Sequence, residues 1–287
     1  MLADNAQAIL TIYVNALKPY GPLVLFILGF IAVACFLGLR TRVLSRNAII
    51  NTATTLGVFL ANIALAPFIY FFVVGMQGLY AKLGIPAISP DFWASVPWLV
   101  MAIVAVIAKD FCDYWSHRAL HTPLLWPIHA VHHSDNHVNG FTTFRVHALE
   151  VVVMRAFEIS MLSWIGIPPV LVASAYIVAT LHNAYVHFEV DIDHGPFNWL
   201  LASPRFHRWH HADQPDAYGK NLANMIPAWD MLFGTYLKAG TCHEKMGLER
   251  DGISSTDTVK LILLPFALWA KQLRTALTGL FSRTRRI

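Results

Sequence analysis

Two long apolar runs without a charged residue limit what this chain can fold into. They cover residues 21–39 and 49–74. About 20 consecutive apolar residues are enough for a helix that crosses a bilayer, so either run can span, the second with some tilt. Only 13% of the 287 residues are charged, whereas soluble domains carry about 25%. We therefore expect an all-α fold, a polytopic membrane helical bundle with a cytoplasmic helical cap.

The loops that flank these runs predict the orientation of the chain. The segment 40–46 reads "RTRVLSR", whereas the loop 75–93 has one lysine and one aspartate. Positive charge favours the cytoplasmic side, which places the 40–48 loop there and the 75–93 loop outside. A third apolar segment, 95–109, returns toward the cytoplasm and can continue as a helix to residue 121. The N-terminus lacks the basic start of a signal peptide, so we expect the first run to be a retained anchor.

The rest of the chain predicts one hairpin and one surface helix. Residues 148–186 are largely apolar but carry Arg155 and Glu158, and "IGIPP" at 165–169 predicts a helix break. The segment 261–270 is too short to span, and basic neighbours on both sides indicate an interfacial helix followed by the basic tail "SRTRR". The predicted organisation is membrane spans over 1–94, a catalytic domain over 95–240, and the interfacial helix and tail over 241–287.

Three cysteines are widely spaced and form no CxxC pair. Neither a disulfide framework nor a thiolate zinc site is indicated. The chain also lacks a basic motif interleaved with aromatic residues, so we expect no nucleic-acid partner, and the basic clusters favour contact with anionic lipid head groups.

Histidine is the residue type that predicts chemistry here. Of 14 histidines, most fall into spaced groups. His117 and His121 are four residues apart, and the pattern HxxHH occurs at 129–133 and again at 207–211. Spacings of three and four place side chains on one side of a helix. Between these groups, "HNAYVHFEV" adds His182 and His187.

These groups predict a metal centre. A lone histidine is usually a surface or core residue, but repeated HxxHH patterns are unlikely by chance, and neutral imidazole is a common ligand of transition metals. Ten candidates exceed what one ion can hold, which predicts two ions with four to six ligands each. The predicted ligands are His117, His121, His129, His132, His133, His182, His187, His207, His210 and His211. We expect ordinary roles for His194 and His243, and no direct ligation by His137 or His147.

The motifs "DYWSHRALH" (113–121), "LWPIHAVHHSD" (125–135), "SPRFHRWHH" (203–211) and "WDMLFGTY" (229–236) resemble those of the fatty acid hydroxylase/sterol desaturase superfamily, in particular its bacterial members. The resemblance covers roughly residues 95–240. It implies a membrane-bound di-iron oxidoreductase, a monooxygenase of lipid metabolism that hydroxylates or desaturates a lipid C–H bond. It also implies two iron ions (Fe2+/Fe3+), O2 as co-substrate and a bacterial inner membrane with the histidines facing the cytoplasm.

The resemblance maps the three histidine boxes onto His117 and His121, onto His129, His132 and His133, and onto His207, His210 and His211. The isolated family histidine best matches His187, and His182 fits an additional ligand of some members. No nicotinamide or flavin fingerprint is present, so electrons would come from a separate reductase, cytochrome or ferredoxin. Asp110, Asp113 and Asp135 are candidates to orient the ligand rings.

Two alternatives stay open. A membrane zinc-dependent hydrolase would need a catalytic carboxylate, as in HExxH, and this motif does not occur. A metal transporter or sensor would carry ligands near the middle of its spans, whereas these histidines follow the apolar segments. The sequence also leaves open whether the lipid is a sterol, a fatty acyl chain, an alkylglycerol or a carotenoid.

Overall fold

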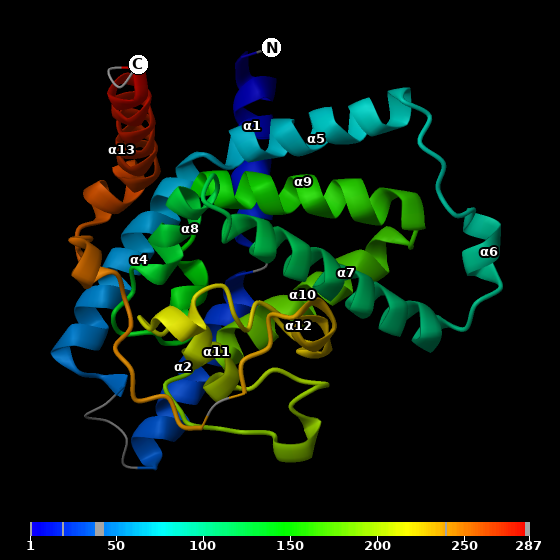
Figure 1. The fold of residues 1–287 in the computed structure, drawn as a ribbon. Coiled ribbons are helices and arrows are strands. Elements are labelled where there is room, and N and C mark those ends of the chain that lie inside the picture. The colour runs from blue at the N-terminus through cyan, green and yellow to red at the C-terminus, as the bar shows by residue number, and fades with distance from the viewer. Residues whose placement is uncertain (1, 19, 38–42, 239, 285–287) are drawn as a thin grey trace.

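The computed structural model describes residues 2–18, 20–37, 43–238 and 240–284 and confirms an all-α membrane helical bundle (Figure 1). Short 3-10 turns, η1 to η4, connect some of the α-helices. The helices are α1 (Leu2–Leu17), α2 (Tyr20–Phe36), α4 (Arg46–Ala64), α5 (Ala66–Lys82), α6 (Pro90–Ala94), α7 (Trp98–Leu120), α8 (Trp126–His133), α9 (Ala148–Ile165), α10 (Pro169–Val186), α11 (Pro204–His210), α12 (Ala228–Phe233) and α13 (Thr258–Thr284). Residues 40–42 of the predicted cytoplasmic loop and 285–287 of the basic tail lie outside this description.

Within the described ranges, three helical stretches are long and apolar enough to cross a membrane. They are Ala6–Phe36, which joins α1 and α2, then Arg46–Ala64, which is α4, and Pro169–Val186, which is α10. The third predicted segment is also helical, because α7 runs without interruption from Trp98 to Leu120. The apolar start of a helix and the first histidine box therefore share one rigid element.

The second apolar run is not one helix, and the prediction of a single span over 49–74 is wrong. The chain leaves helical geometry at Leu65 (φ −91°, ψ 0°), and α5 begins with a proline in its first turn. Pro67 has no N–H and its ring crowds the preceding turn, which favours a break in the helix at this point. The following segment also differs from the predicted loop, because α5 continues to Lys82 and α6 forms at 90–94.

The predicted helical hairpin over 148–186 has its break where the sequence indicates. Helix α9 ends at Gly166, which adopts a left-handed conformation (φ 68°), and Pro168 and Pro169 begin α10. Glycine adopts this conformation without the Cβ penalty of other residues. Helix α7 packs against both α9 and α10, and α5 packs against α9. The hairpin thus forms the centre of the bundle.

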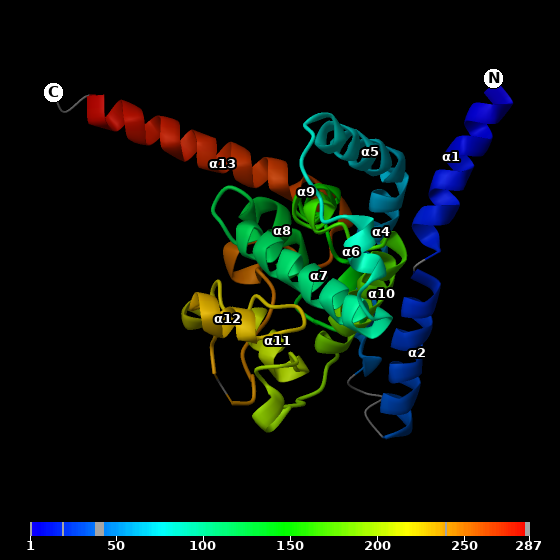
Figure 2. The same cartoon turned by 90° about the vertical axis from the view of Figure 1, so that its right-hand side faces the viewer.

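The C-terminal helix is longer than predicted. Instead of ten residues, α13 has 27, with Pro265 inside it. Its N-terminal part packs against α8 and α4, and its C-terminal part leaves the body of the molecule, on the side away from α1 and α2 (Figure 2).

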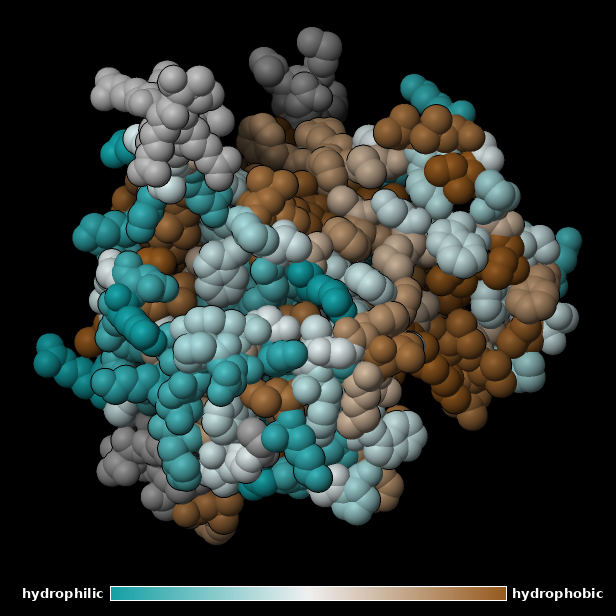
Figure 3. Space-filling model, viewed as in Figure 1, coloured by the Kyte–Doolittle hydropathy of each residue, from teal (hydrophilic) through white to brown (hydrophobic). Residues whose placement is uncertain are grey.

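Apolar and polar side chains are segregated on the surface. In Figure 3, hydrophobic residues gather over α5, α6 and the start of α7, whereas hydrophilic residues dominate the region of α11 and α12. Trp98, Leu99 and Ile103 of α7 and Phe68 and Phe71 of α5 are exposed. Exposed apolar patches of this kind mark a membrane-facing surface.

Candidate metal centre

Nine of the ten predicted ligands come together in the structure as two groups. Within each group, the ligand atoms lie within 4.8 Å of one another. The first group contains His117, His121, His129, His133 and His210, and the second group contains His132, His187, His207 and His211. The tenth candidate, His182, lies in neither group.

Each HxxHH motif contributes to both groups. In the motif on α8, the first and last histidines, four residues apart, face the first group, and the middle one faces the second group. In the motif at the end of α11 the assignment is reversed. The middle histidine, His210, faces the first group, and the first and last histidines face the second group. On a helix, the residues three and four positions after a given residue lie on opposite sides of it. The two motifs therefore bind the two groups into one unit.

Backbone carbonyl groups orient several rings through the outer nitrogen, Nδ1. The Nδ1 of His117 donates to the Leu222 carbonyl at 2.7 Å, and that of His210 donates to the Lys220 carbonyl at 2.8 Å. In the second group, His187 Nδ1 donates to the carbonyl of Asn183 at 2.6 Å. Because a carbonyl only accepts, the proton is on Nδ1 and the lone pair is on Nε2. This arrangement is typical of histidines that bind a metal through Nε2.

The inward nitrogen atoms face one another at distances that a metal-free protein does not explain. Nε2 of His117 lies 3.0 Å from Nε2 of His129, whose Nδ1 is bonded to Glu150. Both Nε2 atoms therefore carry lone pairs, which repel each other. In the second group, His187 Nε2 lies 3.0–3.3 Å from the Nε2 atoms of three other rings. A cation at each centre would satisfy these lone pairs, so the donor set fits metal ions.

Three further ring nitrogens of the first group are buried without a hydrogen-bond partner. They are Nε2 of His121, His133 and His210. Buried polar atoms are normally paired, and each exception needs an explanation. Metal coordination gives one for all three.

Burial keeps the rings in the neutral form that a metal requires. The pKa of His210 falls to about 3 and that of His187 to about 4, in both cases mainly because burial disfavours the charged ring. Burial, and then the neighbouring imidazoles, hold the pKa of His132, His207 and His211 well below the ordinary value. These rings are therefore neutral at pH 7, ready to coordinate.

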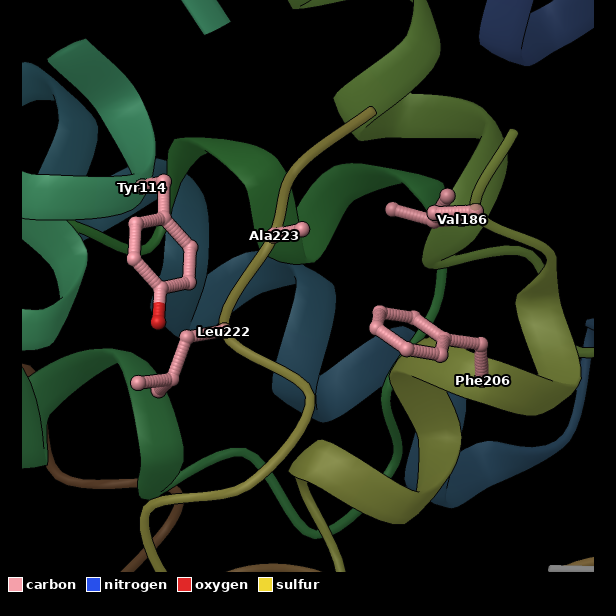
Figure 4. Packing of buried hydrophobic residues seen from close by; sticks show 6 residues of the cluster. Tyr114, Val186, Phe206, Leu222 and Ala223 are labelled. Atoms are coloured by element: carbon pink, nitrogen blue, oxygen red, sulfur yellow. The ribbon is translucent and has the colours of Figure 1, made fainter. Parts of the chain in front are cut away.

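A hydrophobic cluster holds the ligand-bearing segments in register. Figure 4 shows Tyr114 of α7, Val186 at the end of α10, Phe206 of α11 and the loop residues Leu222 and Ala223. Val186 and Phe206 each directly precede a ligand of the second group, and Leu222 supplies the carbonyl that orients a ring of the first group. Movement of any one segment would thus displace ligands on the others.

The three predicted ring-orienting acids have other partners in the described residues. Asp110 accepts hydrogen bonds from the backbone N–H groups of Met225 and Ile226. Asp113 pairs with Lys109, and Asp135 accepts from Thr142 and lies 3.5 Å from an Arg145 nitrogen. Among the residues that the structure describes, none of these three carboxylates is hydrogen-bonded to a histidine ring of the two groups. Asp110 instead fixes the loop that follows the carbonyls of residues 220 and 222.

Glu150 is the acid that contacts a ligand, and the sequence reading missed it. Its Oε1 accepts from Nδ1 of His129 at 2.9 Å, and both side chains are buried. Asp230 has an indirect role, since it accepts from the N–H groups of Leu222 and Ala223 at 2.8 Å. Asp230 lies in the motif "WDMLFGTY", and Glu150 lies in "HALE" at 147–150, but no local spacing links either residue to a histidine of the two groups.

Three of the remaining histidines make identifiable contacts outside the two groups. His147 caps α9, where its Nδ1 accepts from the N–H of Leu149. His137 pairs with Glu189 at 3.1 Å, and His194 bonds to the Tyr185 hydroxyl at 2.8 Å.

A large cavity extends from the metal centre into the bundle. Its volume is about 850 Å³, and α1, α2, α4, α5, α7, α9 and α10 contribute to its walls. His117 of the first group and His132 and His207 of the second group line it, together with Glu150. Cavities of this size suit a small molecule or a single lipid chain.

A known family matches the part of the chain that carries the two histidine groups. The family model described as fatty acid hydroxylase matches residues 102–235. This range contains both histidine groups, most of α7 and all of α8 to α12.

Three relatives match between 50% and 62% of the chain. The ornithine lipid hydroxylase OlsE of Rhizobium tropici is 32% identical over 153 residues, which cover 51% of this chain and 44% of the relative. The alkylglycerol monooxygenase of Homo sapiens is 29% identical over 180 residues, 62% of this chain and 37% of the relative. The very-long-chain aldehyde decarbonylase GL1-6 of Oryza sativa subsp. japonica is 28% identical over 162 residues, 50% and 24% of the two chains. The matches thus span less than half of these relatives, and no solved structure matches the chain.

Proposed function

We propose that this chain is an O2-dependent monooxygenase that hydroxylates a lipid, because residues 102–235 match the fatty acid hydroxylase family model. The single observation that carries the proposal is the meeting of two histidine groups with a lipid-sized cavity. The names of the relatives support it, since they include a lipid hydroxylase and an alkylglycerol monooxygenase.

The proposed cofactors are two iron ions, one for each histidine group. Five rings would hold the first ion and four rings the second, and His182 would bind neither ion. When bound, the iron centre supplies the oxidising power for O2-dependent attack on a C–H bond. Nitrogen ligands without a coordinated carboxylate leave the charge of the metal largely uncompensated, which favours an electrophilic oxidant.

The protein's own residues would fix the geometry for this reaction. The carbonyl groups of residues 183, 220 and 222 hold rings by Nδ1, so that each Nε2 points inward before a metal arrives. The apolar side chains of the cavity walls would align the lipid beside the centre. Orientation of this kind accelerates a reaction by removing the entropy cost of alignment.

Two further features belong to the proposal. Electrons come from a separate protein, such as a reductase, a cytochrome or a ferredoxin. The histidines face the cytoplasm of a bacterial inner membrane, which the basic loop around Arg46 supports through the positive-inside rule.

Metal content and lipid products test the proposal together. We expect the protein purified from membranes to hold iron, and cells that express it to accumulate a lipid that carries one oxygen atom from isotopically labelled O2. Zinc in place of iron would favour the hydrolase alternative. Iron-loaded protein with no labelled lipid, in a host that supplies electrons, would contradict the monooxygenase activity.

A further inference from the structure

Four charged side chains, two of each sign and three of them buried, form a cluster at the cavity. The ion cluster consists of Lys109 and Asp113 on α7 and Arg155 and Glu158 on α9. Lys109 Nζ lies 2.5 Å from an Asp113 oxygen and 3.1 Å from a Glu158 oxygen. Arg155 pairs with Glu158 on its other side. Lys109, Asp113 and Arg155 line the same cavity as the metal centre.

Tyr176 of α10 joins the ion cluster from the opposite wall. Its ring lies 4.8 Å from the Lys109 ammonium and 4.4 Å from the Arg155 guanidinium, and its hydroxyl accepts a hydrogen bond from Arg155. The ion cluster is therefore held by three helices of the central bundle, a rigid support for recognition.

Stability does not explain the ion cluster. Taking charges out of water costs several kcal/mol for each ion, and apolar residues in their place are often as stable. Ionisable side chains inside a membrane bundle are costly and are generally functional. Among the described residues, none of the four side chains is hydrogen-bonded to a histidine of the two groups, so we look to a ligand in the cavity as their partner.

Hydrogen-bonding capacity remains for such a ligand. An arginine has five N–H donors and a lysine has three. Glu158 and Tyr176 accept hydrogen bonds from two Arg155 nitrogens, and Asp113 accepts one from Lys109, which also forms an ion pair with Glu158. The Arg155 side chain is also 29% exposed, in contrast to 4% for Lys109. The ion cluster can thus donate further bonds to polar groups that enter the cavity.

The charge balance sets what can bind. Two positive and two negative groups cancel, so a ligand with net charge would leave one unpaired charge in a poorly solvated site. A head group of zero net charge adds hydrogen bonds without this cost.

The ion cluster also lies close to the metal ligands. Asp113 precedes His117 by one helical turn and Lys109 precedes it by two, which is roughly 6 Å and 12 Å along α7 at about 1.5 Å per residue. A lipid anchored here would present carbon atoms near its polar end to the metal centre.

We propose that the ion cluster is the head-group subsite of the lipid substrate and selects head groups of zero net charge. This inference rests on the proposed function, because it takes the cavity to be the substrate site.

Three lipids that share a hexadecyl chain length and differ in charge test the selection. They are hexadecylglycerol (neutral), palmitate (anionic) and hexadecylamine (cationic). Each displaces a fluorescent acyl probe from the iron-loaded protein in detergent, and the ratios of their affinities are compared among variants. Since partitioning of each lipid into micelles is the same for all variants, a changed ratio reports on the protein.

Charge changes in the ion cluster should shift these ratios in opposite directions. Glu158→Gln gives the ion cluster a net positive charge, so binding of palmitate relative to hexadecylglycerol should rise by about tenfold or more. Lys109→Met should shift the preference toward hexadecylamine by a similar factor. The double variant Lys109→Met/Glu158→Gln is the matched control, because it restores neutrality and should restore the wild-type ratios.

Arg155→Gln is a second variant that removes a positive charge, in case Lys109→Met does not fold. Because Arg155 is partly exposed, its replacement should disturb the fold less. It too should shift the preference toward hexadecylamine. Unchanged ratios in Glu158→Gln and Arg155→Gln would overturn the head-group subsite. Iron content and turnover are measured separately, so a failed monooxygenase assay with shifted ratios would contradict the proposed function and not the subsite.

Discussion

At the scale of single residues, several histidines of the candidate metal centre use both of their ring nitrogens. Nε2 faces the proposed ion, while Nδ1 of His117, His187 and His210 donates to a carbonyl group. These outer contacts fix the tautomer and the ring plane, which is why metal affinity depends on residues that never touch the metal.

His132 and His182 form a matched pair for testing the ligand assignment. Both are histidines predicted as ligands, but only His132 belongs to one of the two groups. We expect His132→Ala to lose the iron of the second group and all lipid oxidation, because three ligands would remain. His182→Ala should keep the iron content of the wild type. Elemental analysis of the purified variants checks this, and iron loss in His182→Ala would show that the second group is incomplete.

Glu150 should act on the metal through His129. Its carboxylate orients the ring and makes the nitrogen facing the metal a stronger donor. We expect Glu150→Leu to weaken iron binding by about 10- to 100-fold, and Glu150→Gln, whose amide oxygen can still accept the bond, to weaken it less. Titration with an iron chelator measures both variants. Equal chelator resistance in Glu150→Leu and wild type would mean that the carboxylate has no role in holding the ring.

At the scale of helices, the sequence predicted elements whose ends carry a strong local signal. Gly166 and the two prolines after it mark the hairpin between α9 and α10, and the structure has the break there. The break at Leu65 was missed because hydrophobicity continues across it and a single proline is the only signal. The division of each HxxHH motif between two groups was also beyond prediction, since it depends on how α8 and α11 face each other and not on their own spacing.

The turn at Gly166 provides a test of the hairpin. Any Cβ at this position would overlap with the carbonyl oxygen of Ile88, whose N–H donates to the Trp164 carbonyl. Gly84 has a similar left-handed conformation (φ 61°) but open space around it. Gly84→Ala should therefore lower the free energy of unfolding by about 1 kcal/mol, from backbone strain alone. Gly166→Ala should cost clearly more, about 2 kcal/mol or above, because the contact between the hairpin and the 83–89 loop is also lost.

Thermal unfolding of the two glycine variants in the same detergent measures the difference. A lower apparent Tm for Gly166→Ala than for Gly84→Ala is expected. Equal shifts would mean that the close approach of Ile88 to the hairpin does not contribute to stability.

At the scale of the whole molecule, the distribution of surface polarity suggests how the protein sits in a membrane. Apolar side chains cover α5, α6 and the start of α7, and polar ones surround α11 and α12 (Figure 3). Helix α7 connects these regions, with exposed Trp98 at its start and the ligand His117 in its last turn. One helix thus leads from the apolar region to the metal centre, so the orientation of α7 determines which side of the membrane the histidines face.

Cysteine labelling at two exposed aspartates tests the proposed orientation. Asp91 lies in α6, in the segment that the positive-inside rule places outside, and Asp216 lies in η3, just beyond the third histidine box. In intact cells, a membrane-impermeant maleimide should label Asp91→Cys and leave Asp216→Cys unlabelled. Opening the membrane should expose both, and the parent protein, with its three native cysteines, gives the background. If Asp216→Cys reacts in intact cells and Asp91→Cys does not, the metal centre faces outward. Its electron donor would then have to be sought on that side of the membrane.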